Sequence, residues 1–235
     1  PGTSITMTGG TIYMLYGGNM GATADSSVGP STITGDVDIT ISNSRIGHSI
    51  YGGGLNKTCV NGCVNMRLES VTVGAYAMGG VSYEGNADDW DIPNNNLTTD
   101  AVVNQVKIHM SKSWAQAVAA TGKGEVRVKY AEITLIDTTI DLEALLNGTN
   151  GITDYCVMTV EGNSYIEQIE AVNRGFLGTG IVNLKGGTVT TLLTAATNNC
   201  FGSYDNSNAA SAVTGTMTWN TSSDVTIEKA ELSPS

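Results

Sequence analysis

The sequence predicts an all-β protein built as a parallel β-solenoid, with short strands stacked coil upon coil in a single domain over residues 1–235. Three observations lead to this prediction: many glycine and β-branched residues, apolar positions that alternate with a period of two, and repetition of that alternation along the chain. The apolar share of 40% is large enough for a core, and 29 glycines supply the turns that many short strands need.

The repetition is clearest in two segments that align without gaps at an offset of 27 residues. The aligned apolar positions are Val37, Ile39, Ile41 and Ile46 in the first copy, and Val64, Met66, Leu68 and Val73 in the second. The shared pattern is apolar, any residue, apolar, then four arbitrary residues and another apolar position. Further copies start at Ile5, Ile108, Val128, Met158 and Val182, and a degenerate copy starts at Met217, which makes about eight.

Each copy predicts a strand, a tight corner, a second strand and a loop. The corner usually holds Gly, Asn or Ser, as at residues 42–44 and 186–188, because these residues tolerate left-handed backbone. The spacing of the copies varies, and the variation falls in the loops after the second strand. A possible helical turn is expected at Leu142–Leu146. A β-sandwich is the alternative fold, but it would show two-residue hairpins at regular spacing.

Composition limits the partners of this chain. The net charge is −11, the pI is about 4.4, and only 14% of the residues are charged. Nucleic acid is not expected as a partner, because neutralising phosphates requires clustered Lys and Arg. Membrane insertion is not expected either, because no apolar run approaches the ~20 residues of a spanning helix. An acidic, lysine-poor surface rich in Asn, Thr and Gly is typical of exported bacterial proteins. No signal peptide is seen, and a start at Pro1 indicates either a processed form or a piece of a longer chain. Because the end coils of a solenoid expose strand edges, and Pro1 and Ser235 lie close to the ends of the repeat, we expect flanking domains in a larger parent protein.

A short motif adds a family resemblance. The string Ile-Tyr-Gly-Gly-Gly at residues 50–54 has echoes at residues 15–18 and 77–80. It resembles repeats in large surface proteins of gut bacteria, which are similar to right-handed parallel β-helices of the pectin-lyase-like class. The resemblance implies a right-handed parallel β-helix of about eight irregular coils and a location at the cell surface or outside the cell. The motif marks a coil, so it implies no catalytic residue.

Four cysteines occur, and two of them lie close together in the sequence. Cys59 and Cys63 flank Asn61-Gly62, where a turn would bring the two thiols near enough to form a disulfide. Free structural cysteines are the alternative. A metal site would need further ligands, and the two histidines are not spaced to supply them.

Two long loops hold the candidate ligand-binding residues. The loop from Tyr83 to Val103 and the loop from Thr197 to Gly215 place aromatic rings among carboxylates and amides. The candidates are Tyr83, Asp88, Asp89, Trp90, Asp91, Phe201, Tyr204 and Asp205. An aromatic ring can stack on a sugar while the polar groups bind its hydroxyls, and the carboxylates can also hold Ca²⁺. The alternative is a solvated loop whose Trp covers the edge of the core. No other cofactor is expected.

The sequence offers no catalytic constellation. The offset of 27 places Asp38 beside Asn65 and Thr40 beside Arg67, and no Ser-His-Asp arrangement or nucleophile elbow is present. The predicted function is therefore a non-catalytic extracellular binding or adhesion module of a bacterial surface protein that presents loops to a host glycan or host glycoprotein. The alternatives are a polysaccharide-cleaving enzyme, either a lyase or a glycoside hydrolase with converging carboxylates, and a purely structural stalk.

Overall fold

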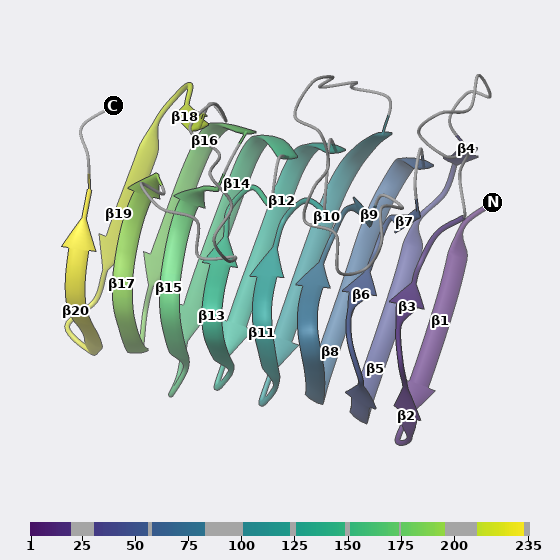
Figure 1. Cartoon of the computed structure of the whole chain (residues 1–235), viewed down its shortest axis with the longest axis horizontal. Coiled ribbons are helices and arrows are strands. Elements are labelled where there is room, and N and C mark those ends of the chain that lie inside the picture. The colour runs from purple at the N-terminus through teal and green to yellow at the C-terminus, as the bar shows by residue number, and fades with distance from the viewer. Residues whose placement is uncertain are drawn as a thin grey trace, which may run out of the picture.

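The computed structural model describes residues 1–19, 31–55, 58–82, 101–122, 126–148, 151–173, 175–195 and 211–232. Within these ranges the chain is all-β, and every regular element is a strand. The strands lie side by side in a row that runs from β1 (Thr3–Thr8) at one end to β20 (Val225–Glu231) at the other (Figure 1). No helix in the described segments is long and apolar enough to cross a membrane.

One set of strands forms a continuous parallel ladder, which we call the first ladder. Besides β1 it contains β5 (Val37–Ile46), β8 (Thr58–Met78), β10 (Ala101–Ser111), β12 (Val126–Ile136), β14 (Gly151–Glu161), β16 (Gly175–Leu184) and β19 (Met217–Thr221). Each strand pairs in parallel with the one before it and the one after it. Two short strands, β4 (Ser31–Ile33) and β18 (Ser211–Val213), pair with the beginnings of β8 and β16.

A second parallel ladder lies in front of the first in Figure 1. Its main strands are β11 (Trp114–Ala119), β13 (Thr139–Leu145), β15 (Tyr165–Val172), β17 (Gly187–Ala195) and β20. Towards the N-terminus it continues through the later parts of β8 and β5 to β6 (Ile50–Tyr51), β2 (Thr11–Ile12) and β3 (Leu15–Tyr16). A separate pair is formed by β7 (Gly54–Leu55) and β9 (Val81–Ser82). We use "rung" for one first-ladder strand together with the second-ladder strand that follows it.

The structure confirms the repeat at an offset of 27, because Ile39 pairs with Met66 and Ile46 pairs with Val73. Two other copies were placed in the wrong register. Ile133, not Val128, pairs with Ile108, and Trp219, not Met217, pairs with Val182. The apolar alternation continues along the whole strand, so the alternation alone does not identify which apolar pair is equivalent between rungs.

The core lies between the two ladders. Alternate side chains of each strand point inward, and equivalent positions stack from rung to rung. One such stack contains Ile39, Met66, Ile108, Ile133, Met158 and Val182. All of these side chains are buried in one continuous apolar cluster. The partly buried Ile5 and Trp219 pack against this cluster from the first and last rungs.

The corner between the two ladders repeats the same backbone conformation. Asn43, Ser70, Lys112 and Asp137 have positive φ angles of 49°, 55°, 49° and 50°, and they occupy equivalent positions in successive rungs. The sequence predicted left-handed corners that are usually built from Gly, Asn or Ser. Lys112 and Asp137 adopt the same conformation, so the corner also accepts other residue types. The next residue in several rungs is a buried hydroxyl. Thr138 donates to the Ile136 carbonyl at 2.9 Å, which satisfies a polar group of the corner.

Candidate functional site

The connections of variable length are flanked by residues at one edge of the stack, which we call the loop-bearing edge. The strands that follow these connections begin at Ser31, Thr58, Ala101, Val126, Gly151, Gly175 and Ser211. These residues stand in one register column, as the pairs Ser31–Thr58, Ala101–Val126, Gly151–Gly175 and Gly175–Ser211 show. The length variation therefore falls after the second-ladder strand of each rung, as the sequence predicted.

The loop residues predicted to bind a ligand all lie outside the described residues. They are Tyr83, Asp88, Asp89, Trp90, Asp91, Phe201, Tyr204 and Asp205. The first five follow Ser82 and the last three follow Ala195, and the next described residues, Ala101 and Ser211, both belong to the loop-bearing edge. These candidates stay predictions.

The two neighbouring cysteines are thiols in the structure and do not form the disulfide that was one of the two expectations. Cys59 and Cys63 are not joined in a disulfide, and β8 runs on through Asn61-Gly62 instead of turning there. The extra length is absorbed by a register shift opposite Val103 and Gln105 of β10. The Cys63 thiol donates to Asn65 Oδ1 at 3.0 Å, and burial raises its pKa. A disulfide would require the turn that β8 does not make.

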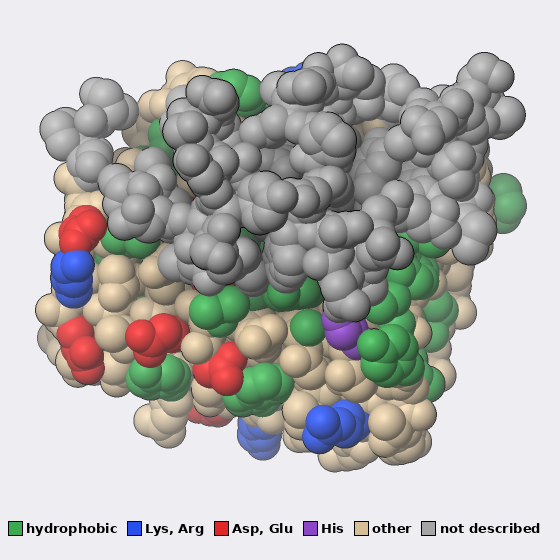
Figure 2. Space-filling view, viewed as in Figure 1, with side chains coloured by type: hydrophobic (Ala, Val, Ile, Leu, Met, Phe, Trp, Pro, Cys, Tyr) green, Lys and Arg blue, Asp and Glu red, His purple; other side chains and the backbone are tan. Residues whose placement is uncertain are grey.

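An exposed row of polar side chains follows the outer face of the second ladder. Tyr165 pairs with Thr139 on one side and with Thr188 on the other. Two residues further along the same strands stand Asp141, Glu167 and Thr190, and the row ends at Glu228 of β20. We call Asp141, Tyr165, Glu167, Thr190 and Glu228 the acidic stripe. Figure 2 shows acidic side chains in a row across the half of this face that contains β13 to β20.

Tyr165 is the aromatic member of the stripe, and its side chain is held in place by its neighbours. The residue is 39% exposed. Its hydroxyl donates to Glu167 Oε2 at 2.5 Å and lies 3.3 Å from Thr190 Oγ1. The hydrogen bond to Glu167 raises the pKa of Tyr165, and burial raises the pKa of Asp141. The stripe therefore combines an oriented ring with oxygen acceptors spaced one rung, ~4.7–4.9 Å, apart.

A second polar group lies further along β13 and β15, and it is completely buried. Glu143 and Glu170 are each 0% exposed. Asn173 Nδ2 donates to Glu143 Oε2, and Gln168 Nε2 donates to Glu170 Oε2, both at 3.3 Å. Burial raises the pKa of Glu143 well above its ordinary value of 4.5, the nearby Glu170 raises this pKa further, and the Asn173 hydrogen bond lowers it. We call Glu143 and Glu170 the buried carboxyl pair.

A second buried cluster lies beside Glu143. Ala115 and Ala117 of β11 face Ile140 and Glu143, so β13 uses one residue more than β11 over this stretch. Ile140 and Ala144 belong to the apolar core between the ladders, whereas Ala117 belongs to the second cluster, together with Tyr76 and Leu145. Glu143 is therefore buried beside the second cluster and not in the core between the ladders.

Backbone and amide hydrogen bonds connect this pair to the loop-bearing edge. Besides its bond to Glu143, Asn173 donates its backbone N–H to Asn147 Oδ1 at 3.0 Å. The Asn147 carbonyl accepts the N–H of Thr121 at 2.7 Å, and its Nδ2 donates to the Gly151 carbonyl at 3.4 Å. Thr121, Asn147 and Asn173 directly precede three of the connections, so the buried pair is linked to the edge from which the connections leave.

The buried carboxyl pair was not predicted from the sequence. A helical turn was expected at Leu142–Leu146, but these residues lie in and directly after β13. A usable signal was the recurrence of Glu-Ala followed by one or two apolar residues and then Asn, at residues 143–147 and 170–173.

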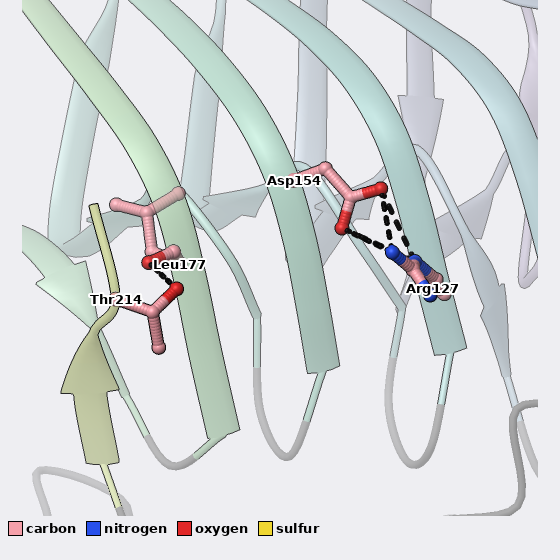
Figure 3. A network of polar contacts seen from close by, with 4 residues as sticks. All are labelled: Arg127, Asp154, Leu177 and Thr214. Atoms are coloured by element: carbon pink, nitrogen blue, oxygen red, sulfur yellow. Dashed lines mark hydrogen bonds and ion pairs between the residues drawn. The ribbon is translucent and has the colours of Figure 1, made fainter. Parts of the chain in front are cut away.

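The outer face of the first ladder carries polar contacts of a different kind. The Arg127 guanidinium forms a bidentate ion pair with Asp154, with N–O distances of 2.9–3.1 Å, and Thr214 Oγ1 donates to the Leu177 carbonyl at 3.3 Å (Figure 3). The Arg127 and Asp154 side chains are 42% and 37% exposed. The ion pair joins the adjacent strands β12 and β14, and the hydrogen bond joins the residue directly after β18 to β16, so both contacts stabilise the stack.

No metal centre is evident in the part of the chain that the structure describes, where no three His, Cys, Asp or Glu side chains are grouped to hold an ion. The two notable arrangements are therefore the exposed acidic stripe and the buried carboxyl pair. Comparison with known proteins found no matching family model, no matching curated protein and no matching solved structure.

Proposed function

We propose that the chain is a non-catalytic binding or adhesion module of a bacterial surface protein, working outside the cell, with a host glycan or host glycoprotein as its ligand. The observation that carries this proposal is the acidic stripe, where Tyr165 stands exposed between Glu167 and Thr190. Sugars present apolar ring faces and rows of hydroxyl donors, and this combination of a ring with oxygen acceptors is suited to both.

The finer description of the scaffold belongs to the same proposal. We infer a right-handed parallel β-helix of about eight coils. The eight successive strands of the first ladder, from β1 to β19, support the coil number. The right-handed sense follows the general preference of parallel strand connections and the family resemblance of the Ile-Tyr-Gly-Gly-Gly string. On such a scaffold the coils carry the fold while surfaces and connections carry recognition.

The proposal assigns different parts to the stripe and to the long connections. The stripe offers a row of contacts along the stack, and neighbouring positions of the row lie on adjacent rungs. The candidates in the connections, Trp90 and Tyr204 among them, would add further contacts to the ligand. A long glycan that crosses several rungs would use repeated weak contacts, and their combined effect would give useful affinity.

A glycan array and a panel of host glycoproteins test this function. We expect binding by the unmodified chain and at least a tenfold loss in Tyr165→Ala and in Glu167→Gln. Tyr13→Ala is the matched control, because Tyr13 is a 68% exposed tyrosine that directly follows β2, in the first rung and away from the stripe. Equal loss in all three variants, or no binding to either panel, would contradict the proposal.

A polysaccharide-cleaving enzyme is the second candidate, and the buried carboxyl pair is the observation that favours it. A raised carboxyl pKa beside a second carboxylate is the pattern of a general acid with its partner. Against this candidate, both groups are 0% exposed, so a substrate does not reach them in this conformation. Incubation with acidic and neutral polysaccharides discriminates the two functions: an enzyme releases oligosaccharides, and Glu143→Gln abolishes the release.

A further inference from the structure

We propose that the buried carboxyl pair is a pH-sensitive lock, which holds the loop-bearing edge in place while at least one of the two carboxyl groups is protonated. The proposal stands on the position of Glu143 and Glu170, both 0% exposed on the paired strands β13 and β15. Its link to ligand binding rests on the proposed function, whereas the lock itself does not.

The pair shares its strands with the acidic stripe. Glu143 follows Asp141 by two residues in β13, and Glu170 follows Glu167 by three residues in β15. The register between the two strands shifts between Ile140 and Ala144, which is the stretch that contains both Asp141 and Glu143. A force that separates the two buried groups therefore acts on the segment that positions the stripe.

The groups that surround Glu143 supply no compensating positive charge within the described part of the chain. From β15, Glu170 faces it, and Asn173 just after this strand gives it one hydrogen bond. Towards β11 the neighbour is Ala117, which is paired with both Glu143 and Tyr76 of β8. Tyr76 is the other titratable group near Glu143, and burial raises its pKa, so it stays neutral throughout the pH range considered. The Oε1 atom of Glu143 has no hydrogen-bond partner among the described residues.

The protonation state decides whether the pair attracts or repels. With one proton present, a carboxyl O–H can donate to the other carboxylate, and the pair carries one buried charge. With no proton, two like charges share a site that excludes water. Because the pKa of Glu143 is higher in the folded chain than in the unfolded chain, its contribution to stability is fully present below about pH 4.5. That contribution is lost as the pH rises through the folded-state pKa.

The effect reaches the edge through hydrogen bonds already described. Glu143 accepts from Asn173, Asn173 donates to Asn147, and Asn147 accepts from Thr121. Ionisation of both carboxyl groups pushes the two strands apart at one end of this chain of bonds. We therefore expect the backbone amides of Asn173 and Thr121 to exchange with solvent faster at high pH than intrinsic exchange alone explains.

The deciding experiment is thermal unfolding of the full chain between about pH 4 and about pH 9. We expect the midpoint of the unmodified chain to fall as the pH rises above about 4.5. Glu143→Gln keeps an oxygen acceptor for Asn173 and adds an N–H donor toward Glu170. It should therefore flatten the profile and raise the midpoint by roughly 3 °C or more near pH 7.

Two further variants complete the design. Glu170→Gln should reproduce the flattened profile, because the repulsion needs both charges. Glu69→Gln is the matched control, since Glu69 is an exposed glutamate on the first ladder, and it should follow the unmodified profile. Hydrogen exchange of the Asn173 and Thr121 amides at low and high pH then localises the effect.

Some outcomes would overturn the lock. A midpoint in Glu143→Gln that is lower by the same amount at every pH would mean that the carboxyl group is only a structural acceptor. A profile that keeps its slope in both Gln variants, or a Glu143→Gln chain that does not fold at neutral pH, would also reject it. None of these measurements uses a ligand. A glycan array without binding would therefore not contradict the lock, and failure of the lock would not contradict glycan binding.

Discussion

Two parts of β13 and β15 are equally buried and chemically opposite. Ile140 and Ile166 face each other at 0% exposure in the apolar core. A few residues further along the same two strands, Glu143 and Glu170 are also 0% exposed, but they carry carboxyl groups with amide partners. Burial therefore does not identify the core of this molecule. What identifies it is the stacking of the same apolar position from rung to rung.

The contrast has a physical reason. Between the ladders, each inward side chain is surrounded by other inward side chains, and a polar atom there would find no partner. Near the loop-bearing edge, backbone groups and the amides of Asn147 and Asn173 are within reach, so polar side chains can be buried with hydrogen bonds. The first environment contributes stability through apolar burial. For the second we expect a smaller contribution to stability, and one that depends on pH because the buried groups are titratable.

The largest effect on stability is expected from truncating a side chain in the apolar core. We expect Ile140→Ala to reduce the free energy of unfolding by about 2–5 kcal/mol, because it leaves a cavity in a close-packed core. Chemical denaturation at neutral pH measures the loss. Ile5→Ala, at a partly buried position in the first rung, should cost clearly less. A loss below ~1 kcal/mol for Ile140→Ala would mean that the rungs repack around the cavity.

An intermediate effect is expected on the polar side. Asn173→Ala removes the amide donor to Glu143 and should cost about 1–3 kcal/mol, with the larger loss at higher pH, where the ionised carboxylate needs that donor more. Denaturation curves at two pH values test this. Asn220→Ala is the matched control, because the hydrogen bond that the Asn220 side-chain amide donates to Asn183 Oδ1 is exposed. Equal costs in the two variants, independent of pH, would remove the distinction between the buried cluster and an ordinary surface contact.

The smallest effect on stability is expected for an exposed ion pair, which serves as a reference for the apolar core and for the buried polar cluster. Asp154→Asn removes one charge from the Arg127–Asp154 ion pair, whose side chains are 42% and 37% exposed. We expect a loss of less than about 1 kcal/mol that shrinks further as salt is added, since water and ions screen an exposed pair. Denaturation at low and high salt measures it. A loss as large as that of Ile140→Ala would show that cross-rung polar contacts, not the core, dominate stability.

The strands of both ladders could be predicted from the sequence because their alternation is strong and repeats. The register was predictable only in part: Val128 and Ile133 both begin an apolar-any-apolar triplet, and only three-dimensional pairing decides between them. The burial of Glu143 could not be predicted, because Glu143 lies on the opposite side of the strand from the core residue Ala144, and the alternation does not reveal that this side is also buried, beside Ala117. The outcome for Cys59 and Cys63 depended on whether Asn61-Gly62 turns or continues, which local propensity does not settle.

The even spacing in the middle of the stack has a consequence for how this protein changes its dimensions. Ile108, Ile133 and Met158 are successive equivalents, 25 residues apart in each step (133 − 108 and 158 − 133). In the described residues, the strands of each such unit pair with strands of the adjacent units, so duplicating or deleting one unit would leave the other strand pairings unchanged. Each added unit would lengthen the molecule by ~4.7–4.9 Å, the distance between paired strands. Genetic duplication can thus adjust the length of the molecule in fixed steps.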